Sequence, residues 1–274
     1  MTTPAGSAGA WTGGAVTASA TCVLAPNPGI MTLEGTNTWL LHPPGTSRAL
    51  VVDPGPRTES HLRAVVDLAA QRGAQITAVL LTHSHADHSE GAAALADLTG
   101  AGVRALDPAY RLGDEGLVDG DVVALDGLEL QVLGTPGHTG DSLSFLLRAD
   151  ATGAALLTGD TVLGRGTTVV IPPDGRLEDY LASLQRLRDL AAAPQEAVGL
   201  VLPGHGPVLT EPVAAIEGYL RHRRARLDEV RAALASGATT VAEVTAVVYA
   251  DVDRALWPAA ALSVRAQLDY LATR

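Results

Sequence analysis

Lysine is absent from this chain, and cysteine occurs only once in its 274 residues. Without lysine, the protein has no side-chain amine that could form a Schiff base or serve as a general base. The lone Cys22 cannot form a disulfide within the chain, and no Cys-x-x-Cys motif is available for a metal or redox site. We therefore expect a reducing, cytoplasmic environment, in which any metal is bound through nitrogen and oxygen atoms.

Aromatic residues are also scarce, at 3 % of the chain, whereas apolar residues make up 47 % and charged residues 18 %. This composition is typical of a globular protein with a core of alanine, valine and leucine. No apolar run is long enough to span a bilayer. The first 33 residues carry no charge, but they lack the basic start and the leucine-rich run of a secretory leader. We therefore expect neither membrane insertion nor export.

Positive charge is in deficit, and the deficit is confined to the first part of the chain. The formal net charge is -11. Residues 211–274 hold eight acids and eight arginines, which leaves 22 acids and 11 arginines in residues 1–210. A protein that binds polyanions in general needs a surplus of positive charge. The composition of residues 1–210 therefore argues against that class of function.

Strand-like and helix-like patterns alternate along the first 210 residues, which predicts an α/β fold. The segment at residues 203–212, with a proline at each end, marks a border between a main domain at residues 1–210 and a helical domain at residues 211–274. Apolar runs predict strands near residues 15–24, 37–41, 49–53, 76–82, 121–133, 142–148, 154–158 and 198–202. Helical periodicity predicts helices near residues 58–72, 89–98, 177–191, 211–235, 239–249 and 254–271.

A dense group of metal-binding side chains follows the strand predicted at residues 76–82. His83, His85, Asp87 and His88 form an H-x-H-x-D-H pattern on a loop that leads into a helix. In extended backbone, His83 and His85 point to the same side, and the turn that follows can direct Asp87 and His88 toward a second position. Loops at strand ends are where rigid scaffolds present ligands. The spacing therefore predicts a metal centre that suits two ions better than one.

Three further candidate ligands each follow an apolar strand and stand beside glycine. They are His138 in T-P-G-H-T, Asp160 in L-T-G-D and His205 in L-P-G-H-G. Glycine lets the backbone turn sharply and approach a metal closely. The other histidines lack such surroundings, and we interpret them as ordinary surface or core residues: His42, His61 and His222.

These motifs resemble, residue by residue, the metal-binding motifs of the metallo-β-lactamase superfamily. The resemblance implies an αββα sandwich with two zinc ions per chain, although manganese or iron also suits the ligand types. It implies the following ligand set: His83, His85 and His138 for the first zinc, Asp87, His88 and His205 for the second, and Asp160 as the bridge.

The resemblance extends beyond the metal ligands. The V-V-D-P-G motif around Asp53 resembles the first motif of the superfamily, in which the aspartate orients a metal-binding histidine; a simple turn residue is the alternative interpretation. Residues 27–29, 33–38 and 163–169 resemble the β-lactamase-like protein 2 family. So do residues 218–223, which lead into that family's associated winged-helix domain.

The C-terminal domain departs from a winged helix in one respect. A winged helix normally follows its last helix with a β-hairpin, but here the sequence ends at Arg274, just after the helix predicted at residues 254–271. We therefore expect a small all-helical, winged-helix-like domain whose wing is short or absent, which weakens a role in nucleic-acid binding. The arginines at residues 221–226 are offset by Asp228 and Glu229, and we interpret them as a solvated face or a cover for the active-site rim.

The expected metal centre predicts hydrolytic chemistry. Two zinc ions that share a water lower its pKa toward about 7 and give a metal-bridging hydroxide without a protein base. Asp87 is expected to orient this nucleophile and to pass a proton to the leaving group, so it is our candidate catalytic residue. Thr167 and Thr168 lie on a glycine-bracketed loop beyond Asp160. They are candidates to line the substrate pocket, with a structural role in the loop as the alternative.

The ligand set does not select the substrate, because the same nucleophile attacks carbon or phosphorus. We favour a small ester or thioester, since the main domain is acidic and the wing is truncated. The alternative is an endoribonuclease that cleaves single-stranded RNA, which the resemblance to the β-lactamase-like protein 2 family implies. A metal-binding partner protein without catalysis is a further alternative, disfavoured by the intact ligand set. The apolar content and superfamily habit also suggest a homodimer.

Overall fold

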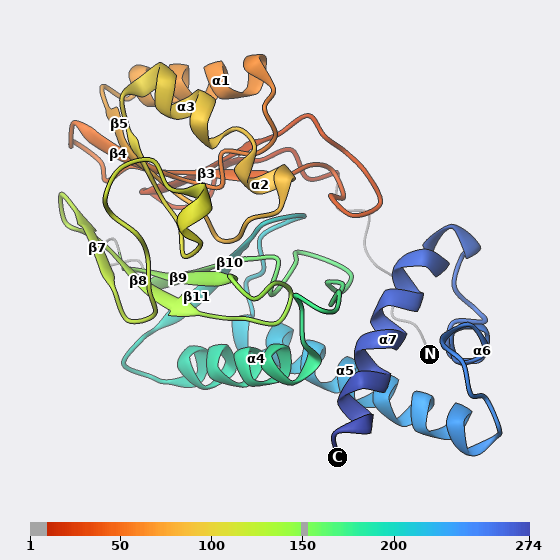
Figure 1. Cartoon of the computed structure of the whole chain (residues 1–274). Coiled ribbons are helices and arrows are strands. Elements are labelled where there is room, and N and C mark those ends of the chain that lie inside the picture. The colour runs from red at the N-terminus through yellow and green to blue at the C-terminus, as the bar shows by residue number, and fades with distance from the viewer. Residues whose placement is uncertain (1–9, 149–152) are drawn as a thin grey trace.

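Two facing β-sheets form the middle of the protein, and helices cover their outer faces (Figure 1). The computed structural model describes residues 10–148 and 153–274. The first sheet contains six strands in sequential order: β1 (Gly14–Ala15), β2 (Ala20–Leu24), β3 (Asn37–Leu41), β4 (Arg48–Val52), β5 (Gln75–Leu80) and β6 (Gly102–Arg104). The second contains five, in the order β11 (Val198–Pro203), β10 (Ala154–Gly159), β9 (Leu143–Arg148), β8 (Leu128–Gly134) and β7 (Val122–Leu125).

Parallel pairing brings the carboxyl ends of neighbouring strands together. Strands β4, β5 and β6 are parallel to one another, and so are β10 and β11, whereas the other neighbours are antiparallel. Because the chain leaves parallel strands at the same edge of the sheet, the loops after β4 and β5 start side by side, and those after β10 and β11 do so too. These loops carry most of the candidate metal ligands.

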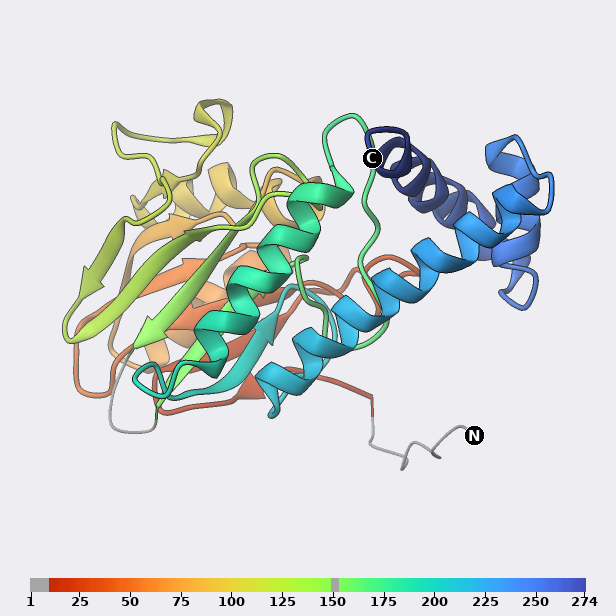
Figure 2. The same cartoon turned by 90° about the horizontal axis from the view of Figure 1, so that it is seen from below.

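The helices form the two outer layers. In Figures 1 and 2, α1 and α3 lie over the first sheet, while α4 and the first half of α5 lie over the second. The helices are α1 (Glu59–Gln71), α2 (Ala86–Ser89), α3 (Ala92–Thr99), α4 (Leu177–Ala192), α5 (Pro212–Ala235), α6 (Val241–Val248) and α7 (Trp257–Ala272), with 3-10 turns η1 (Pro108–Tyr110) and η2 (Arg254–Leu256). This order of helix, sheet, sheet and helix confirms the predicted αββα sandwich and the α/β class.

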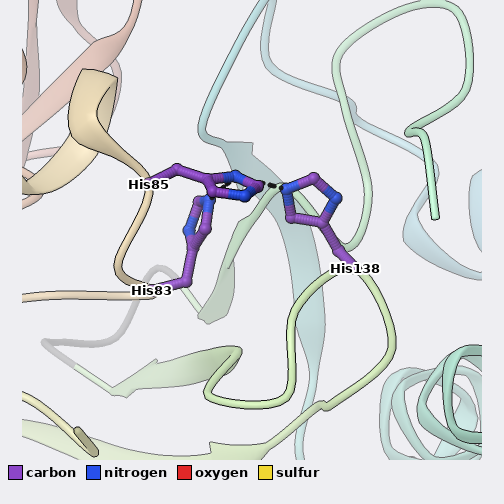
Figure 3. Close-up of side chains that lie close together, drawn as sticks. All are labelled: His83, His85 and His138. Atoms are coloured by element: carbon purple, nitrogen blue, oxygen red, sulfur yellow. Dashed lines mark hydrogen bonds between the residues drawn. The ribbon is translucent and has the colours of Figure 1, made fainter. Parts of the chain in front are cut away.

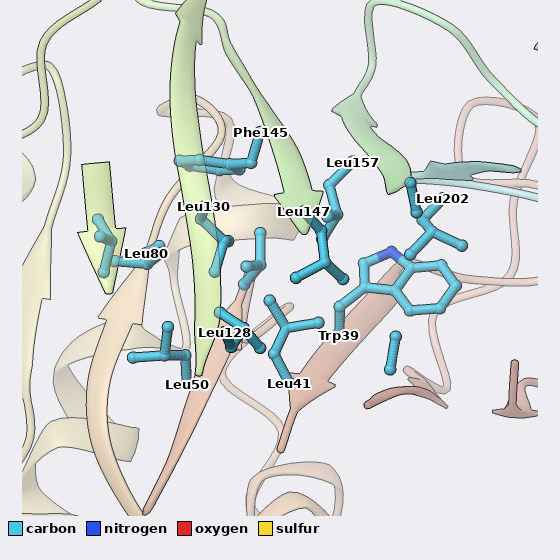
Figure 4. Close-up of a cluster of buried hydrophobic side chains, with 14 of the residues drawn as sticks. Trp39, Leu41, Leu50, Leu80, Leu128, Leu130, Phe145, Leu147, Leu157 and Leu202 are labelled. Atoms are coloured by element: carbon cyan, nitrogen blue, oxygen red, sulfur yellow. The ribbon is translucent and has the colours of Figure 1, made fainter. Parts of the chain in front are cut away.

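The main core lies between the sheets, where leucines surround the indole ring of Trp39 (Figure 4). Alternation along β3 creates the layers: Trp39 and Leu41 point into the space between the sheets, whereas Leu40 packs under α1 and α3. The indole nitrogen of Trp39 donates a hydrogen bond to the carbonyl of Pro203, 3.1 Å away, so the two sheets are also joined by a polar contact. Each fully buried leucine stabilises this core by about 1.5–3 kcal/mol.

The C-terminal region consists of helices and 3-10 turns, and residues 211–274 contain no strand. Helix α5 belongs to two apolar clusters: Ile216 and Leu220 pack with α4 of the sandwich, while Val230 packs with α6 and α7. The domain boundary at residue 210 therefore stays a prediction, because one continuous helix joins both parts. Among the residues that the structure describes, no helix is both long enough and apolar enough to cross a bilayer.

The structure corrects several predicted elements. The strand expected at residues 121–133 is a hairpin of β7 and β8, since Asp126 and Gly127 both have positive φ, at 49° and 91°, as a tight two-residue turn requires. The strand expected at residues 15–24 is likewise divided, into β1 and β2. The short strand β6 was not predicted.

One local expectation at a helix start was also wrong. Asp87 and His88 lie on the one-turn helix α2 and not on an irregular loop. The helical turn still directs the side chains of Asp87 and His88 toward the other candidate ligands, as the sequence spacing predicted.

Candidate metal centre

All seven candidate ligands meet at one edge of the sandwich. The chain leaves β5 just before His83, β10 just before Asp160 and β11 just before His205. The loop between β8 and β9 brings His138 to the same place. Segments that are far apart in the sequence therefore converge because their strands end at a common edge. The side chains form overlapping groups, each with donor atoms within 4.8 Å of one another: His83, His85 and His138; His83, His88 and Asp160; Asp87, His88 and His205.

Three imidazole rings form the first group (Figure 3). Nδ1 of His85 lies 3.1 Å from Nε2 of His83 and 3.0 Å from Nε2 of His138. The nitrogens of a tetrahedral zinc site are about 3.3 Å apart, which follows from zinc–nitrogen distances near 2.05 Å. The three nitrogens are thus spaced as one metal ion requires.

The second group combines two imidazoles with a carboxylate. Nε2 of His205 lies 3.1 Å from Oδ2 of Asp87 and 3.2 Å from Nε2 of His88. Nε2 of His88 lies 3.5 Å from the same oxygen of Asp87. Two nitrogens and one oxygen therefore face a common point, an arrangement that suits a divalent metal.

Asp160 lies between the two groups. Its Oδ2 is 3.4 Å from Nε2 of His205 and 3.7 Å from Nε2 of His138, which belong to different groups. Its Oδ1 is buried and has no hydrogen-bond donor among the residues that the structure describes. A buried carboxylate oxygen without a donor is costly, so this atom fits a metal ligand. The position suits the bridging role expected of Asp160.

The outward-facing nitrogens fix which imidazole atoms are free for a metal. Nδ1 of His138 lies 2.7 Å from the carbonyl of Val169, and Nδ1 of His205 lies 3.2 Å from the carbonyl of Gly35. A carbonyl only accepts, so Nδ1 must carry the proton in both rings. The lone pair of each neutral ring is then on Nε2, which faces the other ligands.

Asp53 supports a histidine from each group. Its carboxylate accepts hydrogen bonds from Nδ1 of His88 at 2.8 Å, from the backbone of Thr82 at 2.8 Å and from the Thr82 hydroxyl at 2.7 Å. The Thr82 oxygen in turn lies 3.0 Å from Nδ1 of His83 and is free to accept its proton. The positive φ of Asp53, 53°, is unusual for a residue other than glycine, and these three bonds offset its cost. The geometry suits the orienting role expected from the sequence.

The two groups have opposite protonation tendencies. Burial holds the pKa of His83 well below its ordinary value, with neighbouring imidazoles adding to the effect, and burial lowers the pKa of His85. Burial also opposes the charged form of His205, but the carboxylates of Asp160 and Asp87 outweigh it and raise its pKa to about 11. For the pKa of Asp160, burial acts upward, yet the imidazoles of His205 and His88 hold it well below its usual range.

Glycine is required beside the ligands because the backbone passes so close to them. A Cβ atom on Gly204 would lie 2.6 Å from Oδ1 of Asp160 and 2.8 Å from Cε1 of His88. Real Cβ atoms essentially never come this close to other heavy atoms, so a side chain at this position would displace one of these candidate ligands. The glycine that precedes His205 in the sequence motif thus has the function that the motif predicts.

A cavity of about 400 Å³ opens beside the ligands. His85, Asp87 and Asp160 are among the residues that line it. Thr167 and Thr168 both line it, but only Thr167 is exposed, whereas the buried hydroxyl of Thr168 lies 3.2 Å from Nδ1 of His138. Of the two threonines, Thr167 is therefore free to contact a substrate, and Thr168 contacts a candidate ligand.

The other histidines lie in different surroundings. His61 is buried and its Nε2 lies 2.9 Å from the hydroxyl of Thr38, and Nε2 of His42 lies 2.9 Å from the carbonyl of Thr46. Both are structural, as expected. His222 on α5 is half-buried and lines the cavity, so it is closer to the site than its sequence surroundings indicated.

Comparisons with known proteins agree with this geometry. Residues 31–205 match the family model of the metallo-beta-lactamase superfamily, and residues 240–274 match that of the beta-lactamase associated winged helix domain. The fold and the site define a metal-dependent hydrolase. The chain belongs to the metallo-β-lactamase superfamily, and it carries the winged-helix-type domain of the β-lactamase-like protein 2 relatives.

Individual relatives cover most of the chain. A beta-lactamase-like protein 2 homolog of Caenorhabditis elegans is 36 % identical over 92 % of this chain and 83 % of its own length. An atrochrysone carboxyl ACP thioesterase of Aspergillus fumigatus is 32 % identical over 83 % of this chain and 72 % of its own. The crystal structure of a metallo-beta-lactamase family protein of Thermus thermophilus superposes with a TM-score of 0.75 at 22 % identity, covering 94 % of this chain and 95 % of that one. The last comparison shows the shared fold.

Proposed function

We propose that this hydrolase uses two zinc ions to cleave a small ester or thioester with an apolar acyl group. The observation that carries the proposal is the lining of the cavity. Beyond the ligands, its wall is mainly aliphatic, and it includes the exposed side chains of Ile30 and Met31, at 64 % and 50 % exposure, and of Leu256. A site that buries a small ligand typically has this size and an apolar wall with a few polar groups.

The donor set of nitrogen and carboxylate oxygen atoms fits zinc, and manganese or iron would also suit it. His83, His85 and His138 would hold one ion, Asp87, His88 and His205 the other, and Asp160 both. When bound, the ions would supply an activated water at neutral pH and polarise the acyl oxygen.

Asp87 is the residue best placed to handle protons. Its side chain is 30 % exposed, compared with 11 % for Asp160, and it lines the cavity. One oxygen contacts His205 and His88, which leaves the carboxylate able to accept a hydrogen bond from the attacking water. We propose that it orients this water and delivers the proton to the departing alcohol or thiol. Asp53 would keep His88 and His83 oriented during turnover.

The name of the Aspergillus relative, a thioesterase that acts on an acyl carrier protein conjugate, supports the choice of an acyl substrate. The charges around the cavity support it as well. Three cavity arginines are already committed: Arg165 pairs with Glu34, Arg226 pairs with Glu229 at 2.6 Å, and Arg223 donates to a backbone carbonyl. A single-stranded RNA channel needs free cations and stacking aromatics.

Endoribonuclease activity is the second candidate. One observation favours it: Tyr249 lines the cavity and has the guanidinium of Arg226 stacked 4.7 Å from its ring centroid, a pair that could support a base. The acidic balance of the main domain opposes this function. A cytoplasmic location and a homodimer remain predictions that cell fractionation and analytical ultracentrifugation would test.

Hydrolysis of thioesters gives a direct assay. Zinc-loaded protein is incubated with short- and medium-chain acyl thioesters, and the released thiol is detected with a thiol-reactive chromophore. Background from the enzyme is low because Cys22 is buried and its thiol pKa is raised to about 12. Asp160→Ala is the inactive variant, and Asp97→Ala, which removes an exposed carboxylate from α3, is the matched control.

We expect wild type and Asp97→Ala to release thiol and Asp160→Ala to release none. The same three proteins are then incubated with a fluorescent single-stranded RNA. Cleavage of RNA by wild type and Asp97→Ala, without hydrolysis of any thioester, would overturn the acyl assignment in favour of the second candidate.

A further inference from the structure

Arg223 is a buried cation without a carboxylate partner in the described part of the chain. Its residue is 3 % exposed, and no ion pair to it occurs among the residues that the structure describes. Its Nη2 donates to the backbone carbonyl of Thr168, and its guanidinium lies over the ring of Tyr180, 5.0 Å from the centroid. A buried charge without an acid is costly, so the hydrogen bond to Thr168 and the contact with the Tyr180 ring are what offset this cost.

The carbonyl that Arg223 binds belongs to an irregular segment, residues 160–171, which pairs with neither sheet. Such a segment is held by contacts from outside. Helix α5 supplies two of them, four residues apart on one face: the Tyr219 hydroxyl accepts from the backbone of Leu163 at 2.8 Å, and Arg223 donates to Thr168. Helix α5 therefore holds the segment at two points, Leu163 and Thr168.

The fastened end of this segment contacts a candidate metal ligand directly. Nδ1 of His138 lies 2.7 Å from the carbonyl of Val169 and 3.2 Å from the hydroxyl of Thr168. The position of these two residues decides the direction of the imidazole ring and keeps the proton on Nδ1. A continuous set of contacts thus runs from α5 to a nitrogen of the first ligand group.

We propose that Arg223 is a positioning residue, which holds Thr168 and Val169 so that His138 presents Nε2 to a metal. The helical region is then part of the metal centre, although it supplies no ligand. The inference rests on the proposed metal site. We assign Arg223 this positioning role and no contact with the substrate, since the residue is 3 % exposed and its Nη2 is already bonded to Thr168.

The main test is Arg223→Met, which keeps an unbranched apolar stem and removes the guanidinium with its charge and its donors. Arg224→Met changes an exposed arginine one position along the same helix and is the matched control. Zinc affinity is measured by competition with a chromophoric chelator. We expect Arg223→Met to bind one of its two zinc equivalents about tenfold more weakly, the lower end of the effect of losing an outer contact to a ligand. Arg224→Met should bind both as wild type does.

Cobalt-loaded protein provides a readout that a purely structural role would not change. Its visible absorption depends on ligand geometry, so Arg223→Met should shift the spectrum and Arg224→Met should not. Arg223→Lys retains the charge and a donor and should recover part of the affinity. Thr168→Val removes only the hydroxyl contact to His138, and its effect on affinity should be non-additive with that of Arg223→Met, because both act on one segment.

Unchanged zinc affinities and an unchanged cobalt spectrum in Arg223→Met, with only a lower melting temperature, would overturn the inference and leave Arg223 a packing residue. If Arg223→Met does not fold, Arg223→Lys and Thr168→Val decide the question by the same two measurements. Failure of wild type to bind any metal is a separate outcome, since it contradicts the proposed function itself.

Discussion

The two ligand groups use the same residue type in opposite electrostatic surroundings. The first contains only imidazoles, and burial lowers the pKa of His83 and of His85. The second contains a carboxylate and has two more beside it, so the pKa values of His88 and His205 are raised despite burial. Without metal, the nearby carboxylates therefore favour protonated imidazoles in the second group, whereas burial favours neutral imidazoles in the first.

The groups also differ in what holds them. In the second group, His88 donates a hydrogen bond to Asp53, which directly follows β4, and His205 donates one to the backbone carbonyl of Gly35. In the first, His138 contacts residues 168–169, which α5 holds through Arg223. We therefore expect the second group to depend on the sheet edges and the segments beside them, and the first group to depend on α5 as well.

Removal of Asp160, the candidate ligand that both groups share, should impair metal binding by both groups. Asp160→Ala deletes the carboxylate that faces both, so we expect loss of both metals and a fall in activity of more than about a hundredfold, beyond the effect of losing an outer contact. Elemental analysis of the purified variant, beside Asp97→Ala, checks the prediction. Retention of two metals by Asp160→Ala would contradict the bridging position.

Asp53→Asn should weaken the second group more than the first. The carboxylate bonds directly to His88 but reaches His83 only through Thr82. We expect zinc affinity to fall about 10- to 100-fold at one equivalent and less at the other. Asparagine tolerates the positive φ of this position, so the fold should persist. Equal losses at both equivalents in a chelator competition would show that Asp53 supports the two groups alike.

Metal binding should release protons, and the second group should be their source. Because the pKa of His205 is about 11, the ring is protonated at pH 7 without metal and must lose its proton to become a ligand. His83 and His85, whose pKa values are lowered, are already neutral. Calorimetric zinc titrations in buffers of different ionisation enthalpy should therefore show the release of at least about one proton per chain, the proton of the His205 ring. Heats that do not depend on the buffer would refute the assignment.

A substitution in the cavity wall that leaves both ligand groups intact should have the smallest effect on activity. Leu256→Ser makes part of the cavity wall polar, and we expect KM for a medium-chain thioester to rise about three- to tenfold, with little change for an acetyl thioester. Leu262→Ser, an exposed leucine on α7 that does not line the cavity, is the control. The same KM increase for both chain lengths would indicate that Leu256 does not contact the acyl group.

Much of the site could be predicted because strand ends and glycine leave a local signal in the sequence. The seven candidate ligands stand in motifs that the αββα fold, confirmed here, brings to one edge. Asp53 could be found because its motif also follows a strand. The turn at Asp126 and Gly127 was missed although its D-G pair is a hairpin signal, because the apolar pattern continues on both sides of it.

Other features left no local signal. Arg223 stands in a run of arginines that is balanced by acids, and sequence alone makes it another exposed charge. The packing of α5 against residues 160–171 and against Tyr180 buries it and leaves its neighbour Arg224 exposed. The lining of the cavity could not be predicted either, because Met31, Val169 and Leu256 come from three segments that are distant in the sequence. Such contacts depend on tertiary packing, which periodicity does not describe.

The most direct test of a centre built from two unlike groups is a stepwise zinc titration of metal-free protein, with bound zinc measured by elemental analysis and thioester hydrolysis measured at each step. We predict that two zinc ions bind per chain and that hydrolysis reaches its full rate only with the second. Binding of a single zinc ion at saturation, or none, would contradict the account.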